Sequence, residues 1–295
     1  MVKLMQPLSF VFFVALLAKL SAAGNTPFAL QGIQSVTYTV FKTGDNVNTQ
    51  HGLSGEIKNF GEDVHRAIQY AVDNSAGGIV HIKGGQYVID NPILLKSYLW
   101  LRGEGNTTHI IQQSLIEPAF LYISKQRSED FIRAKSQTDK VDEEVIKELR
   151  FYKKYGATDS GFVHLKISDL HVSGPRGNSV CDGIRLENAN AYNGTLLLEN
   201  LFIEGFGGWN IYAYRCYSGS FTIRNCSIIG WDNKNDTRIG NGIYTELCHG
   251  LSIRDCEICD LNVGVYINRG YGITIDGVVS EKITNEAFKL EKCNA

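Results

Sequence analysis

The chain of 295 residues carries 29 Lys and Arg against 31 Asp and Glu, which gives a formal net charge of −2. Its basic residues are scattered, and this excludes the basic footprint of a nucleic-acid-binding protein. The length suits one elongated domain or two compact ones, and the repeats described below favour one.

The first 23 residues have the order of a secretory signal peptide. Lys3 precedes an apolar run from Pro7 to Leu20, and Ser21-Ala22-Ala23 supplies the small residues of a cleavage site. The run is shorter than the ~20 apolar residues that span a bilayer, and an uncleaved anchor is the alternative interpretation. We expect a secreted or cell-surface protein, without membrane contact after cleavage, in which residues 24–60 lead into a main domain of residues 61–295.

A short amphipathic helix is predicted over Asp63 to Ser75. Its apolar residues recur at helical spacing, and Gly77-Gly78 ends it. We expect this helix to cap a core at the N-terminal end. Short β-rich runs punctuated by glycine follow from Gly78 to Gly105 without helices between them, which argues against a doubly wound α/β fold and favours a solenoid.

A charged insertion interrupts the pattern near residues 125–160. Within it, Asp139 to Tyr155 places apolar residues near helical spacing. The pattern predicts an inserted helix on one side of the solenoid, acting as a lid, a packing arm, a partner surface or simply a solvated segment.

Five segments that align with one another begin at Phe162. Each has an alternating strand, then Asp or Asn, then a second strand, and the markers are Asp169, Asn200, Asn225, Asp255 and Asp276. A variable loop and a third strand follow in each segment. This irregular period of roughly 20 to 30 residues predicts an all-β parallel β-helix with three strands per coil.

Stacked coils place equivalent residues in columns. Asp and Asn tolerate the dihedrals of a tight bend and bond neighbouring turns, so the markers are expected to form a polar ladder. The same register stacks Cys226 on Cys256 and Cys216 on Cys248. Two interpretations stay open: disulfides between neighbouring coils, or reduced cysteines packed as small apolar residues. Glycosylation sequons begin at Asn106, Asn193, Asn225 and Asn235.

The stretch from Gly61 to Ile111 resembles the pectate-lyase-like domain of rhamnogalacturonase- and epimerase-like proteins. The residues that carry the resemblance are Ala67–Val72, Gly77–Tyr87, Leu95–Ser97 and Leu101–Gly105. The resemblance implies a right-handed parallel β-helix that acts on or binds a polysaccharide. It implies a reaction only loosely, because the superfamily includes lyases, hydrolases, epimerases, adhesins and tail-spike proteins.

Two departures from the family pattern bear on the mechanism. The family's Asp-rich opening is reduced to Gly61-Glu62-Asp63, and of the motifs of polygalacturonase-type hydrolases only Cys181-Asp182-Gly183-Ile184 has a counterpart. These departures argue against that hydrolase mechanism and favour a non-catalytic adhesin or glycan-binding protein as the alternative function.

The resemblance also implies that the strand after each variable loop lines the substrate cleft with its outer face. Alternation then points Ile184, Ile211, Ile243, Val265 and Phe288 inward. The expected substrate-binding residues are Trp209, Tyr212, Tyr214, Trp231, Tyr244 and Tyr266. The alternative is that these tyrosines stabilise the sheet without any ligand.

Two kinds of chemistry remain open for this cleft. Asp232 and Asp236 offer oxygen ligands for Ca²⁺, so that Arg238, Lys234 or Arg185 would abstract the proton next to a uronate carboxyl in β-elimination. Alternatively, Asp182 and Glu246 would act as acid and base in glycoside hydrolysis. For each acidic residue singly, a solvated loop charge is the competing interpretation.

The C-terminal residues Glu291 to Ala295 directly follow a strand, without a segment that would cover the last coil. Because solenoid ends normally need covering, we expect self-association through this end, a truncated module, or a tail that packs in another way.

Overall fold

The computed structural model describes residues 36–125, 150–159, 163–189, 194–232, 237–238 and 240–294. Residues Ser35–Ala295 form one compact unit. The helices are α2 (Val64–Asn74) and α5 (Arg150–Tyr155). The strands are β1 (Val36–Thr43), β2 (Asn46–His51), β3 (Ile57–Asn59), β4 (Ile79–Ile82), β5 (Gly85–Ile89), β6 (Ile93–Leu94), β7 (Leu99–Gln112), β8 (Phe120–Ile123), β9 (Leu165–Ser173), β10 (Ile184–Glu187), β11 (Leu196–Glu204), β12 (Trp209–Tyr214), β13 (Tyr217–Arg224), β14 (Ser227–Ile229), β15 (Trp231–Asp232), β16 (Thr237–Arg238), β17 (Asn241–Glu246), β18 (His249–Arg254), β19 (Glu257–Cys259), β20 (Val265–Asn268), β21 (Thr274–Asp276), β22 (Val279–Glu281) and β23 (Phe288–Glu291).

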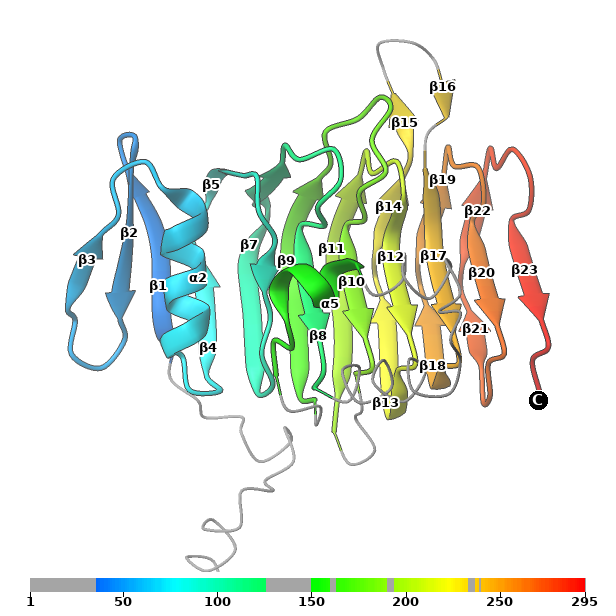
Figure 1. Ribbon diagram of the computed structural model, residues 1–295. Helices are drawn as coiled ribbons and strands as arrows, with labels where there is room; N and C mark the ends of the chain where they lie inside the picture. Colours follow the sequence, from blue (N-terminus) through cyan, green and yellow to red (C-terminus); the bar gives the residue numbers. More distant parts are fainter. Residues whose placement is uncertain are drawn as a thin grey trace, which may run out of the picture. The chain divides into compact units, whose positions relative to one another are not determined.

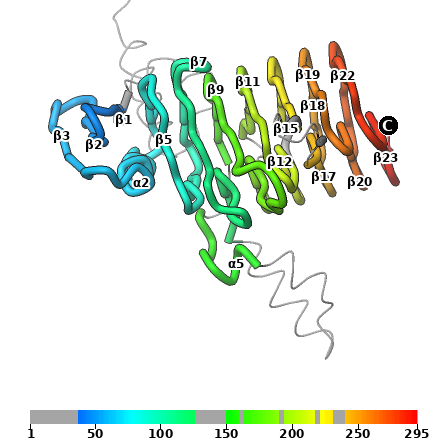
Figure 2. Tube along the Cα trace, turned by 90° about the horizontal axis from the view of Figure 1, so that it is seen from above, coloured from blue at the N-terminus to red at the C-terminus, as the bar shows by residue number. Residues whose placement is uncertain are grey.

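The strands stack in successive coils, as Figures 1 and 2 show. A 7-stranded sheet runs in the order β6-β8-β10-β12-β17-β20-β23, and its neighbouring strands are parallel. A 14-stranded sheet supplies the other two strand segments of each coil, because its strands bend midway. The first half of β11 pairs with β13 and its second half with β14. Three strand segments per coil confirm the predicted parallel β-helix.

The bend within the larger sheet is made by the predicted polar ladder. Asp169, Asn200, Asn225 and Asp255 all have left-handed backbone conformations, with φ between 51° and 57°. The Asn200 side-chain amide donates to Asp169 Oδ1 at 2.9 Å, and the Asn225 amide donates to Asn200 Oδ1 at 3.4 Å. Asn and Asp adopt this conformation more readily than other residues with a side chain. The ladder therefore fixes the position of each corner.

At the last corner of the polar ladder, the structure shifts the predicted marker residue by one position. Arg254 pairs with Asp276, so the corner residue above Asp255 is Gly277, with φ 61°. A Cβ at Gly277 would lie 2.5 Å from Asp255 Oδ1. Glycine thus satisfies the same backbone requirement where a side chain would not fit.

The core follows the predicted alternation. Ile184, Ile211, Ile243 and Val265 are fully buried. Phe288 is 42% exposed, because β23 is the edge strand of the described part of its sheet. Association through this end of the β-helix stays a prediction.

The cysteines lie in the columns predicted for them. The pairing of Ser227 with Glu257 places Cys226 beside Cys256 in neighbouring coils. All seven cysteines of the chain are free thiols in the structure. Burial, together with the neighbouring Cys248 thiol, raises the pKa of the Cys216 thiol. The columns therefore pack as reduced side chains here, and disulfide formation stays a prediction.

Helix α2 matches its predicted bounds. Asp63 caps it by accepting a hydrogen bond from Arg66 N at 2.9 Å. Its five buried residues, Val64, Ala67, Ile68, Ala71 and Val72, belong to the main core. The antiparallel strands β1, β2 and β3 before it were not predicted.

Two predictions concern segments that lie wholly or partly outside the described residues. The signal peptide of residues 1–23 is one. The other is the inserted helix, of which only the last part, Arg150–Tyr155, is described and is helical. Across the described ranges, no helix combines the length and apolar character needed to cross a bilayer.

The polar ladder predicts a specific pattern of stability loss. Asn200→Ala removes two ladder hydrogen bonds and places a less tolerant residue in the left-handed conformation, which together should cost about 1–2 kcal/mol. Asn200→Gly loses the same bonds but keeps the backbone freedom, so it should cost less. Urea unfolding monitored by circular dichroism measures both. Equal losses would show that backbone conformation does not contribute.

Candidate functional site

The outer surface of the 7-stranded sheet carries two columns of polar and aromatic side chains, in the predicted register. Their members are Arg185, Tyr212, Tyr244, Tyr266 and Lys289 in the first column, and Glu187, Tyr214, Glu246, Asn268 and Glu291 in the second. Parallel strands lie ~4.8 Å apart, so each column presents one side chain per coil at that spacing.

We call the part of this surface formed by Tyr212, Tyr244, Tyr266, Glu246 and Glu291 the aromatic face. The rings of Tyr212 and Tyr244 stack at 5.1 Å with an interplanar angle of 16°, and Tyr266 meets Tyr244 edge-on at 5.3 Å. All three tyrosines are partly exposed. Stacked rings of this kind can stabilise a sheet whether or not a ligand binds.

Each carboxylate of the aromatic face is paired with a phenol. Tyr244 donates to Glu246 Oε2 at 2.6 Å, and Tyr266 donates to Glu291 Oε2 at 2.8 Å. Burial and the bond to Glu246 raise the pKa of Tyr244 far above its ordinary value, so its phenol stays protonated. The bond from Tyr266, assisted by Lys289, holds the pKa of Glu291 below its usual value. These pairs offer donors and acceptors side by side.

Cations complete both carboxylate sites. Arg269 forms an ion pair with Glu246 Oε1, which also accepts a bond from the Asn268 amide at 3.3 Å. Lys289 lies 3.1 Å from Glu291 Oε1 and 4.7 Å from the Tyr266 ring centroid. Such a surface can bind sugar hydroxyls through its carboxylates and an acidic sugar through its cations.

The Arg185 end of the surface is buried, contrary to the open cleft expected there. The Arg185 guanidinium donates to Asp182 Oδ2 and to Glu187 Oε1, each at 2.7 Å. It also lies 3.9 Å from the Tyr212 ring centroid and 4.9 Å from that of Phe151. Arg185 is only 7% exposed and Glu187 is fully buried. The reason is α5, whose Phe151 packs over this coil.

The charges of this buried cluster hold one another. Burial alone would lower the pKa of Arg185, but attraction to Glu187 and Asp182 outweighs it and raises that pKa. Asp182 additionally accepts a hydrogen bond from the Trp209 backbone N at 2.8 Å. Arg185 is thus a positively charged structural element beneath α5, poorly placed to abstract a substrate proton.

Asp182 and Glu246 are not brought together as an acid–base pair. They belong to coils two apart and differ by about five positions along the strand, which separates them by roughly 15–20 Å. Glycosidase carboxyl pairs lie about 5–9.5 Å apart. By contrast, Glu246 and Glu291 share a column with Asn268 between them, so their backbones are about 10 Å apart. Column membership was the signal in the sequence that identifies this second pair.

Five further predicted residues lie in the loop of residues 230–240: Trp231, Asp232, Lys234, Asp236 and Arg238. Trp231 pairs with Arg238, and Asp232 with Thr237, in the antiparallel ribbon of β15 and β16. Lys234 and Asp236 lie outside the described residues, so the Ca²⁺ site predicted at Asp232 and Asp236 stays a prediction. Within the described ranges, no three His, Cys, Asp or Glu residues are grouped as metal ligands would be.

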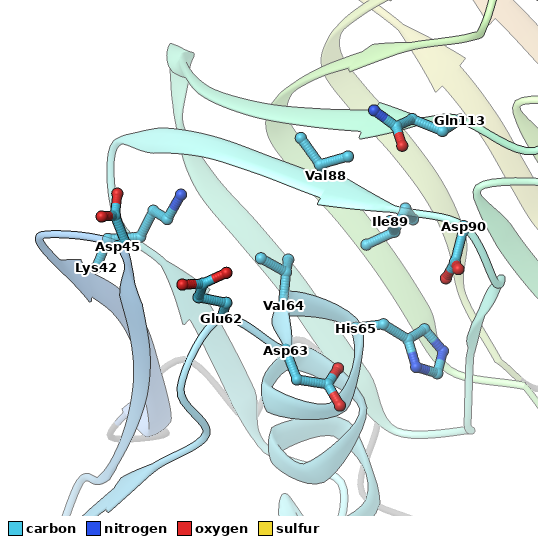
Figure 3. Close-up of a pocket in the computed structure, with 10 residues that line it drawn as sticks. All are labelled: Lys42, Asp45, Glu62, Asp63, Val64, His65, Val88, Ile89, Asp90 and Gln113. Carbon is cyan, nitrogen blue, oxygen red and sulfur yellow. The ribbon is translucent and has the colours of Figure 1, made fainter.

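A pocket of about 600 Å³ lies near the start of α2 (Figure 3). Asp45, Glu62, Asp63 and Asp90 give it an acidic lining. Two of its other polar side chains hold structural bonds: Lys42 donates to Gln86 O at 3.0 Å, and the His65 ring bonds Pro92 O at 3.2 Å. We therefore interpret these residues as a structural junction between α2 and the first coils.

A histidine cluster on the larger sheet was not predicted. The rings of His109 and His171 stack at 3.7 Å, and His171 Nε2 lies 3.3 Å from Glu204 Oε1. His109 Nε2 bonds Ser173 Oγ at 2.7 Å. Burial, with the neighbouring His171, lowers the pKa of His109 to about 4. The outward position of His171 in its alternating strand was the available signal.

The sequence of residues 45–266 matches the family described as rhamnogalacturonase A/epimerase, pectate lyase-like. The chain belongs to this family. The match covers most of the β-helix of this rhamnogalacturonase A/epimerase-type protein, including β12, β17 and the first two residues of β20. Comparison with curated proteins found no match.

Three solved structures are similar to this family member at low identity. One is the catalytic unit of the thermostable GH87 α-1,3-glucanase of Streptomyces thermodiastaticus strain HF3-3 (18% identity, TM-score 0.35, 78% of this chain and 38% of that chain). The others are ORF18 of Geobacillus virus E2 (13%, 0.32, 84% and 66%) and the A-module of mannuronan C-5 epimerase AlgE6 of Azotobacter vinelandii (14%, 0.31, 78% and 65%). The chain therefore spans well under half of the glucanase unit and about two thirds of the other two chains.

The buried ion cluster predicts a large effect of removing Arg185. Arg185→Ala leaves Asp182 and Glu187 buried without their cation, which should cost about 3–5 kcal/mol of unfolding free energy. The matched triple variant Asp182→Asn, Arg185→Met, Glu187→Gln removes all three charges and should lose less. Urea unfolding at pH 7 tests this, and a loss below about 1 kcal/mol for Arg185→Ala would contradict it.

The histidine stack predicts an acid-sensitive component of stability. Because the folded-state pKa of His109 lies below the unfolded value, its contribution is present above about pH 6.5 and is lost as pH falls toward 4. The thermal midpoint of the wild type should therefore fall more between pH 7 and pH 5 than that of His109→Gln. His51→Gln in β2 serves as a control. Identical falls in wild type and His109→Gln would refute the assignment.

Proposed function

We propose that this protein is an exported carbohydrate-active protein that binds a polysaccharide along the aromatic face and cleaves it by glycoside hydrolysis. The observation that carries the proposal is the row Glu246, Asn268 and Glu291, which places two carboxylates in one column on the outer side of the sheet with a phenol bonded to each. Membership of the rhamnogalacturonase A/epimerase family supports a polysaccharide as the substrate.

The chemistry of the row suits a glycosidic bond lying above Asn268. The backbone separation of about 10 Å lets the two carboxyl groups approach the spacing used by inverting enzymes, about 6.5–9.5 Å, which leaves room for a water molecule. The lowered pKa of Glu291 keeps it ionised and fits it for the role of general base. Inverting hydrolysis needs one carboxyl in each role, so Glu246 is then the general acid.

Cations near both carboxylates favour a uronate-containing chain. Arg269 is exposed and Lys289 is partly exposed, so both can reach a substrate carboxylate. The same positive charges would serve a lyase or an epimerase, in which the proton next to that carboxylate is removed. The products distinguish these reactions.

A non-catalytic glycan-binding role is the second candidate. It is favoured by the engagement of both carboxylates: Glu246 is held by Tyr244, Asn268 and Arg269, and Glu291 by Tyr266 and Lys289. A surface whose charges are already compensated can bind sugar hydroxyls without performing chemistry. Export, predicted from residues 1–23, belongs to both candidates.

The two carboxylates predict the outcome of an activity screen. The mature protein is incubated with polygalacturonate, rhamnogalacturonan, alginate and neutral glycans, with and without Ca²⁺, while reducing ends and unsaturated uronate absorbance are followed. We expect new reducing ends without that absorbance. Glu246→Gln and Glu291→Gln should each lower kcat by about 100-fold or more, whereas Glu286→Gln, an exposed residue before β23, should leave it unchanged.

Other outcomes of the screen assign the other functions. New ends together with absorbance would establish a lyase, and altered uronate stereochemistry without new ends an epimerase. Glycan binding without any reaction would establish the non-catalytic role. Full activity of both Gln variants would reject Glu246 and Glu291 as the catalytic pair.

A further inference from the structure

The aromatic face ends abruptly at one coil. Moving from β23 toward β10, the partly exposed residues Tyr266, Tyr244 and Tyr212 are followed by Arg185, which is buried. The guanidinium of Arg185 covers the Tyr212 ring, and it also lies over the Phe151 ring of α5. The surface along the ladder therefore meets a wall made by α5.

The wall continues beyond Arg185. Leu121 and Ile123, the outward residues of β8, are fully buried and pack with Phe151, Tyr152 and Tyr155. Figure 1 shows α5 in front of β8 and β10, and Figure 2 shows it on the side of the stack where β12, β17 and β20 lie. No part of these outward positions is left for a ligand that follows the column of tyrosines.

Bonds at its base and along its length hold the wall in place. Glu117, which is 6% exposed, accepts bonds from Lys154 Nζ at 2.8 Å and from the Tyr155 hydroxyl at 3.0 Å. After α5, the chain returns to β8, where Thr158 N donates to Ile123 O at 2.8 Å. The position of α5 is thus set by polar contacts at both of its neighbouring elements as well as by Phe151.

We propose that α5 restricts the aromatic face to the end of a polysaccharide chain, so that the protein releases one short oligosaccharide at a time. This inference rests on the proposed function. A chain that follows the tyrosines runs along the axis of the β-helix and stops at Arg185 and Phe151. Asn268 lies midway between the two carboxylates, and its coil is three coils away from β10. The distance along the axis of the β-helix is therefore about 14 Å. That length accommodates a short oligosaccharide, whose size the wall then fixes.

The product distribution tests the inference. With polygalacturonate as the first substrate, wild-type protein should release a single short product from the earliest times, and the polymer should shorten slowly. A ladder of many product lengths at early times would overturn the inference while leaving the proposed function intact. Absence of any reaction and any binding, across the glycan panel, would overturn both.

A variant that lacks the wall can be compared directly with the wild type. Lys125 N donates to Asp159 O at 2.8 Å, so the two ends of the insertion are adjacent. Replacement of residues 126–157 by a short glycine-serine linker should leave the coils intact and convert the product pattern to mixed lengths. Phe151→Ala, which removes the one buried side chain of α5, should shift the pattern in the same direction. Leu115→Ala, at a 55% exposed position, is the control. An unchanged single product in both wall variants would contradict the inference.

A binding measurement covers the case of a protein that binds without cleaving. The affinity of the protein is measured for intact polygalacturonate and for polygalacturonate cut to about one tenth of its length, at equal mass. If the protein binds chain ends, the fragmented polymer should show an apparent affinity per unit mass about tenfold higher than the intact polymer. The reason is that the same mass then contains about ten times as many ends. Prior borohydride reduction of the reducing ends shows which end is bound. Equal affinity for intact and fragmented polymer would overturn the inference.

Discussion

The whole structure depends on the left-handed corner that recurs in each coil. Asp169, Asn200, Asn225, Asp255 and Gly277 occupy it in turn, and each bends the chain at the same point of the larger sheet. The register of every parallel pair follows from that bend. Since side chains alternate between the two surfaces of a strand, a shift of one residue would exchange the core with the exterior. The corner thus decides which side chains reach solvent.

Above this scaffold, electrostatics divides the outer surface of the 7-stranded sheet into two regions. Around Arg185, two carboxylates and one guanidinium are removed from water, and such a cluster is tolerated only because its geometry and hydrogen bonds compensate the lost hydration. Around Glu246 and Glu291, by contrast, Tyr244, Tyr266 and Lys289 are partly exposed and Arg269 is exposed, although Glu246 itself is only 7% exposed. The difference between the two regions is made by one short helix, since the columns themselves continue through both.

The sequence alone could predict the features that follow from a regular spacing of residue types along the chain. The alternation of strand residues identified the column of Tyr212, Tyr244 and Tyr266, and helical spacing identified α2. The same reasoning placed Asp276 at a corner, and this was wrong, because glycine serves a left-handed corner as well as Asp does and Gly277 stands next to it.

Features that depend on contacts between distant segments could not be predicted. The burial of Arg185 depends on Phe151, which precedes it by 34 positions in the sequence and belongs to an insertion that follows no repeat. The separation of Asp182 from Glu246 likewise required the number of coils between them. Glu246 and Glu291 were both in a predicted column, but nothing in the sequence showed that the Arg185 end of that column would be closed.

The adjacency of Lys125 and Asp159 has an evolutionary consequence. When the two ends of an excursion are hydrogen-bonded to each other, the closure entropy grows only slowly with the length of the excursion, by about 0.6 kcal/mol for each doubling. Lineages can therefore lengthen, shorten or exchange the segment between these residues at little thermodynamic expense to the coils. Selection on this one segment would let a common scaffold diversify in what it accepts, while the residues of the exposed surface stay the same.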